Sequence, residues 1–290
     1  MDNYLGYSPK PSTPAALVEN VLQLVSLPEV YLRLQAVIED PLHSRKQVAE
    51  LIGYDPGLSA RLLRIANSAY YSFPGEIDSI STAVNIIGEM ELRNITLAIS
   101  VADAVSQLGQ PGIDIDAFWL HSIKCALIAR LSAKQVGNAY ADSLFLAGML
   151  HDLGQLVLYR NEPELARAVA WHQREYNISR HLAEQALLGF DHSVLGGLLA
   201  RSWGLPETLC DLIMHHHTPE LVEANRPLAD IIVLANHLAQ PECDVASELA
   251  DSPSSIFPLL KRVGITGSDV TLVAEKAVQQ CDEVLSLICG

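Results

Sequence analysis

The chain has 290 residues, of which 49% are hydrophobic and 18% charged, and its formal net charge is -15. This balance supports a large folded core and excludes a disordered chain. The acidic field repels a phosphate backbone, so the composition also argues against nonspecific nucleic-acid binding. Aromatic residues make up only 6%, and a core of Leu, Ala, Ile and Val suits helix packing better than strands.

Cysteine usage and hydropathy bear on the cellular location. The five cysteines are odd in number, widely spaced and without a C-x-x-C pair, which is typical of reduced thiols and gives no support to a structural zinc knuckle. Residues 1–14 lack the apolar core of a signal peptide, and no run approaches the ~18 apolar residues of a membrane helix. We therefore predict a cytoplasmic protein with a flexible leader at 1–14 and no membrane partner.

Helical periodicity begins at Ala15 and continues through the first half of the chain. Ser44 and Asp55 are predicted helix N-caps, and the proline after Asp55 occupies a position where its missing N–H costs nothing. Ser81 is predicted to cap a short helix that ends at Gly88. These signals indicate several short helices in succession.

The stretch 106–115, which bears glycine and proline, marks the clearest internal boundary. It separates helices predicted over about 89–105 and 118–134. The nearly all-apolar segment 143–150 is predicted to be a helix buried on all sides. The same periodicity predicts helices over 162–176, 179–188, 192–202, 206–216 and 227–239, a linker over 240–255 and a closing helix over about 268–288. No alternating strand pattern occurs, so the predicted fold is an all-α multi-helix bundle.

The ten histidines carry the clearest chemical signal. His151 and Asp152 directly follow the apolar segment, and burying an ionised Asp beside a His is costly unless something compensates. A divalent metal ion compensates, because it accepts a neutral imidazole and a carboxylate together. Adjacent helix positions point about 100° apart, so we expect a bend after Asp152, near Gly154, to help the two side chains converge.

Other candidate ligands are scattered along the chain, and each has an ordinary alternative. The candidates are His121, His192, His215, His216, His217, Asn236 and His237. The triple histidine could instead complement a helix C-terminus, and Asp191 could be only an N-cap. Lys124, one turn from His121, could neutralise phosphate or be a solvated side chain. We interpret His43, His172 and His181 as hydrogen-bonded core or surface residues.

Taken together, these residues and six longer motifs resemble the HDOD family, a branch of the HD phosphohydrolase superfamily, over roughly 15–240. The motifs are "DPGLSARLLRIANSAYY" at 55–71, "ISTAVNIIG" at 80–88, "FWLHS" at 118–122, "LAGMLHDLGQLVL" at 146–158, "GFDHSVLGGLLARSWGLP" at 189–206 and "HHHTP" at 215–219. The resemblance implies an N-terminal helical subdomain at 15–110 and an HD-like helical core at 116–240. Residues 241–290 would then be a linker and a C-terminal helix.

The resemblance also implies a set of metal ligands. In HD hydrolases a His, a His-Asp pair and a late Asp bind one metal ion. The matching residues here are His121, His151, Asp152 and, at the late position, Asn236. Two-metal relatives that cleave cyclic dinucleotides add further histidines, which match His192, His216 and His217. The implied cofactor is one or two divalent transition-metal ions, namely iron, manganese, zinc or nickel.

Two departures from the hydrolase pattern bear on activity. Asn236 lacks the charge of the family's late Asp, and 218–220 read Thr-Pro-Glu where the cyclic-dinucleotide-cleaving relatives carry Gly-Tyr-Pro. HDOD proteins are generally viewed as regulatory modules without demonstrated catalysis. The leading prediction is therefore a catalytically inactive signalling module that acts through regulatory protein partners.

Two alternatives remain open. The first is a metal-dependent phosphohydrolase acting on a nucleotide or cyclic-dinucleotide phosphodiester, with Asp152 bridging two ions and Lys124 beside the phosphate. The second is nucleic-acid binding by short helices of the first half, through Arg61, Arg64 and Arg93. No basic cluster accompanies these arginines, so we predict no nucleic-acid site.

Overall fold

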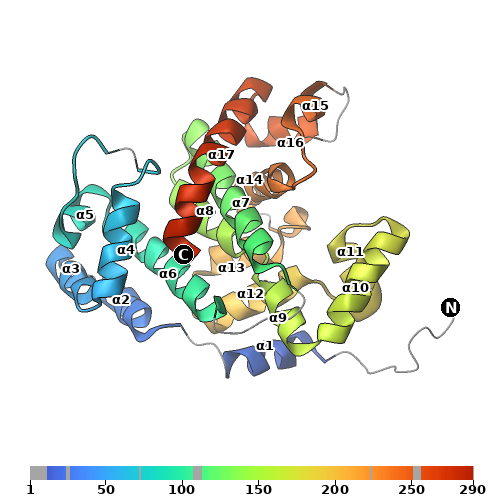
Figure 1. Ribbon diagram of the computed structural model, residues 1–290, viewed down its shortest axis with the longest axis horizontal. Coiled ribbons are helices and arrows are strands. Elements are labelled where there is room, and N and C mark those ends of the chain that lie inside the picture. The colour runs from blue at the N-terminus through green and yellow to red at the C-terminus, as the bar shows by residue number, and fades with distance from the viewer. Residues whose placement is uncertain are drawn as a thin grey trace.

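A computed structural model describes residues 12–23, 27–71, 73–106, 113–222, 224–250 and 256–289 of the chain. Across these ranges the secondary structure is helical and contains no strand, which confirms the predicted all-α class (Figure 1). None of the helices in these ranges is both long and apolar enough to cross a membrane. Most of the predicted leader, the glycine and proline positions of the 106–115 boundary and the end of the predicted linker lie outside the described residues.

The described residues of the first half form six helices. They are α1 (Pro14–Leu22), α2 (Glu29–Glu39), α3 (Arg45–Gly53), α4 (Pro56–Ala66), α5 (Ile80–Ile86) and α6 (Glu89–Ser106). Figure 1 shows α2 to α5 gathered at one end of the molecule, with α6 leading into the body. Helix α1 lies apart from them, against α9 and α12 of the second half. The first helix of the predicted N-terminal subdomain therefore packs on the other half of the protein.

The second half is built around the long helix α7. Its elements are α7 (Ile115–Gln135), α8 (Ala141–Leu150), α9 (Leu153–Asn161), α10 (Pro163–Tyr176), α11 (Arg180–Leu188), α12 (His192–Ser202), α13 (Glu207–Met214), the 3-10 helix η1 (Pro219–Leu221), α14 (Arg226–Ala239), α15 (Val245–Ala250), α16 (Ile256–Val263) and α17 (Gly267–Cys289). Helices α8, α14 and α17 all pack against α7 (Figure 1). Helix α8 is buried on almost every side, as its apolar sequence predicts.

Local capping chemistry places most helix starts of the first half. Ser44 forms a capping box with Gln47, and the Asp55 carboxylate accepts a hydrogen bond from the Leu58 amide, as predicted. Ser79 caps α5 by accepting a hydrogen bond from the Thr82 amide, so the prediction that Ser81 is the cap was wrong. Both serines have the right chemistry, and the helix starts earlier because Ile80 is buried.

Three helices lack a counterpart in the sequence-based prediction. Helix α9 is buried almost all round, so it shows no polar face from which a helical period could be read. Helix α15 falls inside the segment predicted as linker. Helix α16 does carry a readable signal, because Ile256, Leu259, Leu260 and Val263 follow helical spacing and are all buried.

A cluster of charged and aromatic side chains joins α6, α7 and α8 with the turn after α4. The Tyr71 hydroxyl donates a hydrogen bond to Glu91, and the Arg130 guanidinium lies 3.9 Å from the centre of the Tyr70 ring. Arg130 Nε also donates to the Asp142 carboxylate, at 2.8 Å. Burial, with the charge of Asp142 second, raises the pKa of Glu91 to about 7 from its ordinary value of 4.5.

This cluster predicts a pH-dependent loss of stability. Between about pH 4.5 and about pH 7 the folded chain keeps a proton on Glu91 that the unfolded chain releases, so the free energy of unfolding falls as pH rises. The loss is up to about 3 kcal/mol. We expect Glu91→Gln to remove this part of the pH dependence, measured by urea unfolding from about pH 5 to about pH 8. Glu19→Gln, at an exposed position, is the control; parallel pH profiles for wild type and Glu91→Gln would refute the prediction.

Candidate metal centre

The turn between α8 and α9 places Asp152 at the centre of a cluster of histidines. His151 ends α8 and Asp152 precedes the first residue of α9. The chain therefore turns at the pair itself, and not near Gly154 as predicted, because Gly154 lies inside α9. Both side chains are buried, with His151 fully covered and Asp152 8% exposed. An ionised carboxylate in such a place requires compensating partners.

The first group of donor atoms faces Asp152 Oδ2. His121 reaches it from α7, with Nε2 3.7 Å from Oδ2. His151 Nε2 lies 3.4 Å from Oδ2 and 3.4 Å from His121 Nε2. These three ligand atoms all lie within 4.8 Å of one another, close enough to share one metal ion.

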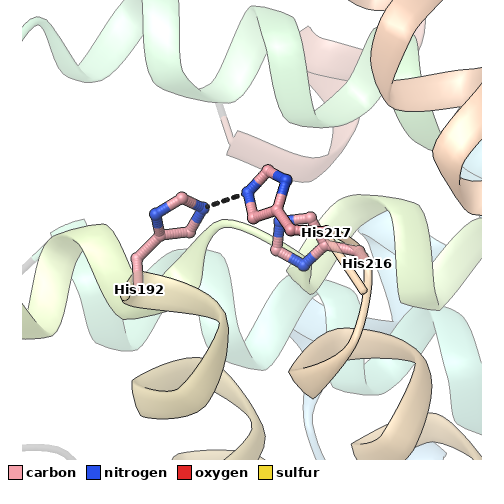
Figure 2. A group of neighbouring side chains, drawn as sticks. All are labelled: His192, His216 and His217. Carbon is pink, nitrogen blue, oxygen red and sulfur yellow. Dashed lines mark hydrogen bonds between the residues drawn. The ribbon is translucent and has the colours of Figure 1, made fainter. Parts of the chain in front are cut away.

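The second group faces the other carboxylate oxygen, Oδ1. His192 starts α12, and its Nε2 lies 3.0 Å from Oδ1. His216 Nε2 lies 3.8 Å from the same oxygen, and His217 Nε2 lies 3.1 Å from His192 Nε2. Figure 2 shows these three rings converging from α12 and from the turn after α13. Asp152 thus lies between two histidine groups and offers one oxygen to each.

Hydrogen bonds to the far ring nitrogens fix the orientation of three of these histidines. His151 Nδ1 donates to the Gly148 carbonyl at 2.8 Å, and His216 Nδ1 donates to the Ile213 carbonyl at 2.8 Å. His192 Nδ1 pairs with Glu184 Oε2 at 2.6 Å. In His151 and His216 the donating Nδ1 leaves a free electron pair on Nε2, which is the arrangement that metal-binding histidines usually adopt.

Three of the rings are neutral, as metal binding requires, whereas His192 is protonated and must release a proton to bind a metal ion. Burial lowers the pKa of His151 and His216, and it lowers the pKa of His217 to about 2, so these rings are neutral. Burial also acts against charge on His192, but Glu184 and Asp152 outweigh it and raise its pKa to about 10. Buried His216 Nε2 has no hydrogen-bond partner among the described residues. A divalent transition-metal ion would satisfy this nitrogen, so the donor set fits such a cofactor.

Glu184 orients His192 of the second group through the ring nitrogen that points away from Asp152. It lies on α11, is fully buried, and accepts hydrogen bonds from both the backbone amide and the ring Nδ1 of His192. We expect Glu184→Gln to weaken metal binding about 10–100-fold, because the amide loses the charge that orients and polarises the ring. Metal titration with a chelating indicator measures this. Exposed Glu175→Gln should bind like wild type; unchanged affinity in Glu184→Gln would contradict the prediction.

A cavity of about 700 Å³ opens onto both groups. Its lining includes Arg180 and His181 from α11, Tyr159 from α9, and Asn236 from α14. Asn236 Oδ1 accepts a hydrogen bond from Gln240. Its role as a ligand stays a prediction.

Lys124 is not part of the cavity lining and lies where its charge acts on Cys243 and Cys281.

Two residues that touch the second histidine group had no part in the prediction from sequence, nor had Arg180 and Tyr159 of the cavity lining. His181, interpreted as an ordinary core or surface residue, stacks on His217 with ring centres 4.0 Å apart and lines the cavity. Glu184 is the second. Its signal was an acidic residue on the buried face of the helix predicted over 179–188, beside buried Ala183 and one turn before buried Leu188.

The arginines of the nucleic-acid alternative are elsewhere in the molecule. Arg61 forms an ion pair with Asp103 at 2.8 Å and donates to the Leu287 carbonyl of α17. Its charge is therefore engaged within the fold, where it joins α4 to α6 and α17. This placement gives no support to a basic nucleic-acid surface.

Comparisons with known proteins identify the family and the fold. The HDOD domain family model matches residues 24–219. An uncharacterised protein of Treponema pallidum (strain Nichols) is 28% identical over 225 residues, and the match covers 77% of this chain but 43% of that protein. The chain thus spans less than half the length of this curated relative.

Two solved structures share the fold over nearly the whole chain. A candidate phosphohydrolase from Shewanella amazonensis SB2B is 29% identical with a TM-score of 0.73, covering 94% of this chain and 97% of that one. An HDOD domain protein of unknown function from Geobacter sulfurreducens is 26% identical with a TM-score of 0.71, covering 95% and 97%. The family match spans more than half of the chain, and the chain belongs to the HDOD domain family.

Proposed function

We propose that the two histidine groups hold two divalent transition-metal ions bridged by Asp152, and that the chain is a metal-dependent phosphohydrolase. The observation that carries the proposal is the position of Asp152, whose two oxygens face separate sets of histidine nitrogens. A purely structural Asp would need only one such set. The Shewanella amazonensis protein, described as a candidate phosphohydrolase, supports the same class.

From the sequence alone, a regulatory module was favoured over a hydrolase, partly because Asn236 lacks the charge of the Asp that hydrolases carry. The donor atoms around Asp152 favour the hydrolase instead. Each group offers three other ligand atoms within 4.8 Å of one another, so neither depends on Asn236 for its first three ligands.

The residues around the cavity suit an anionic phosphate ester as substrate. Metal ions bound here would lower the pKa of a coordinated water and stabilise charge on the leaving oxygen. Asp152 and Glu184 are the carboxylates of the centre, and they offset only part of the charge of two divalent ions. The guanidinium of Arg180 lines the cavity and donates to the Tyr159 hydroxyl at 3.3 Å, which leaves further N–H donors for phosphate oxygens. Together these charges favour a nucleotide or cyclic-dinucleotide phosphodiester.

We expect Arg180→Gln to raise KM about 10-fold or more while changing kcat less, because a charged hydrogen bond to bound substrate is worth about 1.5–3 kcal/mol. Steady-state kinetics of the metal-loaded chain with a chromogenic phosphodiester measures this. Arg174→Gln is the matched control, since Arg174 donates to a backbone carbonyl of its own helix α10. Equal KM values in the two variants would show that Arg180 does not bind the phosphate.

The test of the proposed function is turnover by the full chain after loading with manganese, iron, zinc or nickel in separate samples. A chromogenic phosphodiester and cyclic dinucleotides serve as substrates. We expect at least one combination to show metal-dependent hydrolysis that is lost in Asp152→Asn. Absence of hydrolysis with every metal, in protein shown to contain two ions, would overturn the proposal.

A regulatory module remains a second candidate function, favoured by Thr218-Pro219-Glu220 in place of the hydrolase signature. In that case the metal centre would stabilise the fold, and helical surfaces would bind a protein partner. Fully loaded protein that binds a nucleotide without hydrolysing it would favour this candidate.

A further inference from the structure

A third group of metal-binding side chains lies apart from Asp152. It consists of His237 in the last turn of α14, Cys243 in the loop that follows, and Glu248 in α15. One ligand atom from each lies within 4.8 Å of the other two. None of the three belongs to the histidine groups around Asp152.

His237 Nε2, the ring nitrogen nearest to Glu248, makes no hydrogen bond to any described residue. The side chain is 39% exposed overall, yet its Nε2 atom is covered and has no hydrogen-bond partner among the described residues. Its nearest acid is Glu248, with Oε1 3.5 Å away, a contact that does not meet hydrogen-bond geometry. Burying such a nitrogen unpaired is costly, and a bound cation would satisfy it.

Cys243 makes the group chemically distinct. It is a free thiol and half-buried. The charged side chains of Glu248 and Lys124 lie near the thiol. A metal ion that replaced the thiol proton would remove the repulsion between a thiolate and the Glu248 carboxylate.

We infer that His237, Cys243 and Glu248 form a separate site for a single zinc ion at the edge of the cavity. Imidazole, thiolate and carboxylate are all ligands that zinc accepts, and a thiolate disfavours manganese and magnesium. With zinc–ligand bonds of about 2.0–2.3 Å the ligand atoms lie roughly 3.3–3.6 Å apart, so atoms within 4.8 Å of one another must approach by at most about 1.5 Å, within reach of side-chain rotation. His237 also lines the cavity, so a fourth position would remain for water or an anion.

The site would join two elements that share few other contacts. Glu248 belongs to the six-residue helix α15, which is too short to be stable by itself, and His237 belongs to the long helix α14. An ion held between them would stabilise the loop at 240–244. Zinc binding is therefore expected to raise the Tm of the full chain as well as to occupy the site.

Cobalt titration of the full chain tests this site without interference from the Asp152 centre, because only a site with cysteine gives thiolate-to-cobalt charge-transfer absorption in the near ultraviolet. We expect cobalt, added until all sites are filled, to produce this band with the intensity of one thiolate site per chain, zinc to abolish it, and Cys243→Ser to remove it. Cys289→Ser is the matched control, since Cys289 is the other half-buried cysteine. The band should persist in Asp152→Asn, which separates this site from the proposed hydrolase function.

His237→Gln provides a second variant in case Cys243→Ser fails to fold. It keeps the thiol but removes the imidazole, so the cobalt affinity should fall at least about 10-fold. No band in wild type, or a band that survives Cys243→Ser or His237→Gln unchanged, would overturn the inference.

Discussion

Asp152→Asn is expected to lower the metal content of the purified chain from about two ions to less than one at the two histidine groups. The carboxylate faces both groups, with Oδ1 3.0 Å from His192 Nε2 and Oδ2 3.4 Å from His151 Nε2. An amide carries no charge and offers a single oxygen, so it cannot serve both groups. Any phosphodiester hydrolysis should fall on the order of 10³-fold, since the lost stabilisation is several kcal/mol.

Elemental mass spectrometry of protein purified without chelator measures the metal content. Asp116→Asn is the control, because Asp116 is exposed in the first turn of α7, the helix that carries His121. The three proteins are also compared in the Cys243→Ser background, so that zinc bound at His237, Cys243 and Glu248 does not contribute to the metal content. Equal metal content in Asp152→Asn and wild type would contradict the role given to this residue.

Gly154→Ala is expected to cause the largest loss of stability of any single methyl addition in the site region. A Cβ built at Gly154 would lie 1.8 Å from the His192 carbonyl oxygen and 2.7 Å from the Gly196 amide nitrogen. Both contacts are backbone atoms of α12, so α9 and α12 would have to move apart. Overpacking typically costs 1–3 kcal/mol, and a rigid backbone clash of this size should cost about 3 kcal/mol or more.

The same displacement should disrupt the metal centre, because α9 begins directly after Asp152 and α12 begins at His192. Urea unfolding and metal content are the two measurements. Gly53→Ala is the matched control, since nothing lies within 4 Å of a Cβ built there and alanine favours the helix by up to about 1 kcal/mol. Similar unfolding free energies for the two variants would show that α9 and α12 are not held at this distance.

The sequence predicted those parts of the fold that depend on local chemistry. The caps at Ser44 and Asp55 are made by side chains within three residues of the amides they bind, so the pattern carries the whole signal. The all-buried helix α9 escaped prediction because its environment is set by helices distant in the sequence. The buried pair His151 and Asp152 was readable because an acid after an apolar helix is costly without a ligand.

The supporting residues of the site could not be read in the same way. Glu184 lies eight residues before His192, and only the packing of α11 against α12 turns its carboxylate toward the ring. His181 is brought onto His217 by the same packing. Their roles come from tertiary contacts, whereas the resemblance to HD hydrolases named only the residues of the motifs themselves.

Anomalous X-ray diffraction from crystals of the full chain grown with manganese tests the central claim most directly. We predict two peaks about 3.5–4 Å apart, on opposite sides of Asp152, one beside His121 and His151 and the other beside His192, His216 and His217. The same crystals of Asp152→Asn should lose both peaks. Manganese that leaves both histidine groups empty in the wild-type crystals would contradict the account of this site.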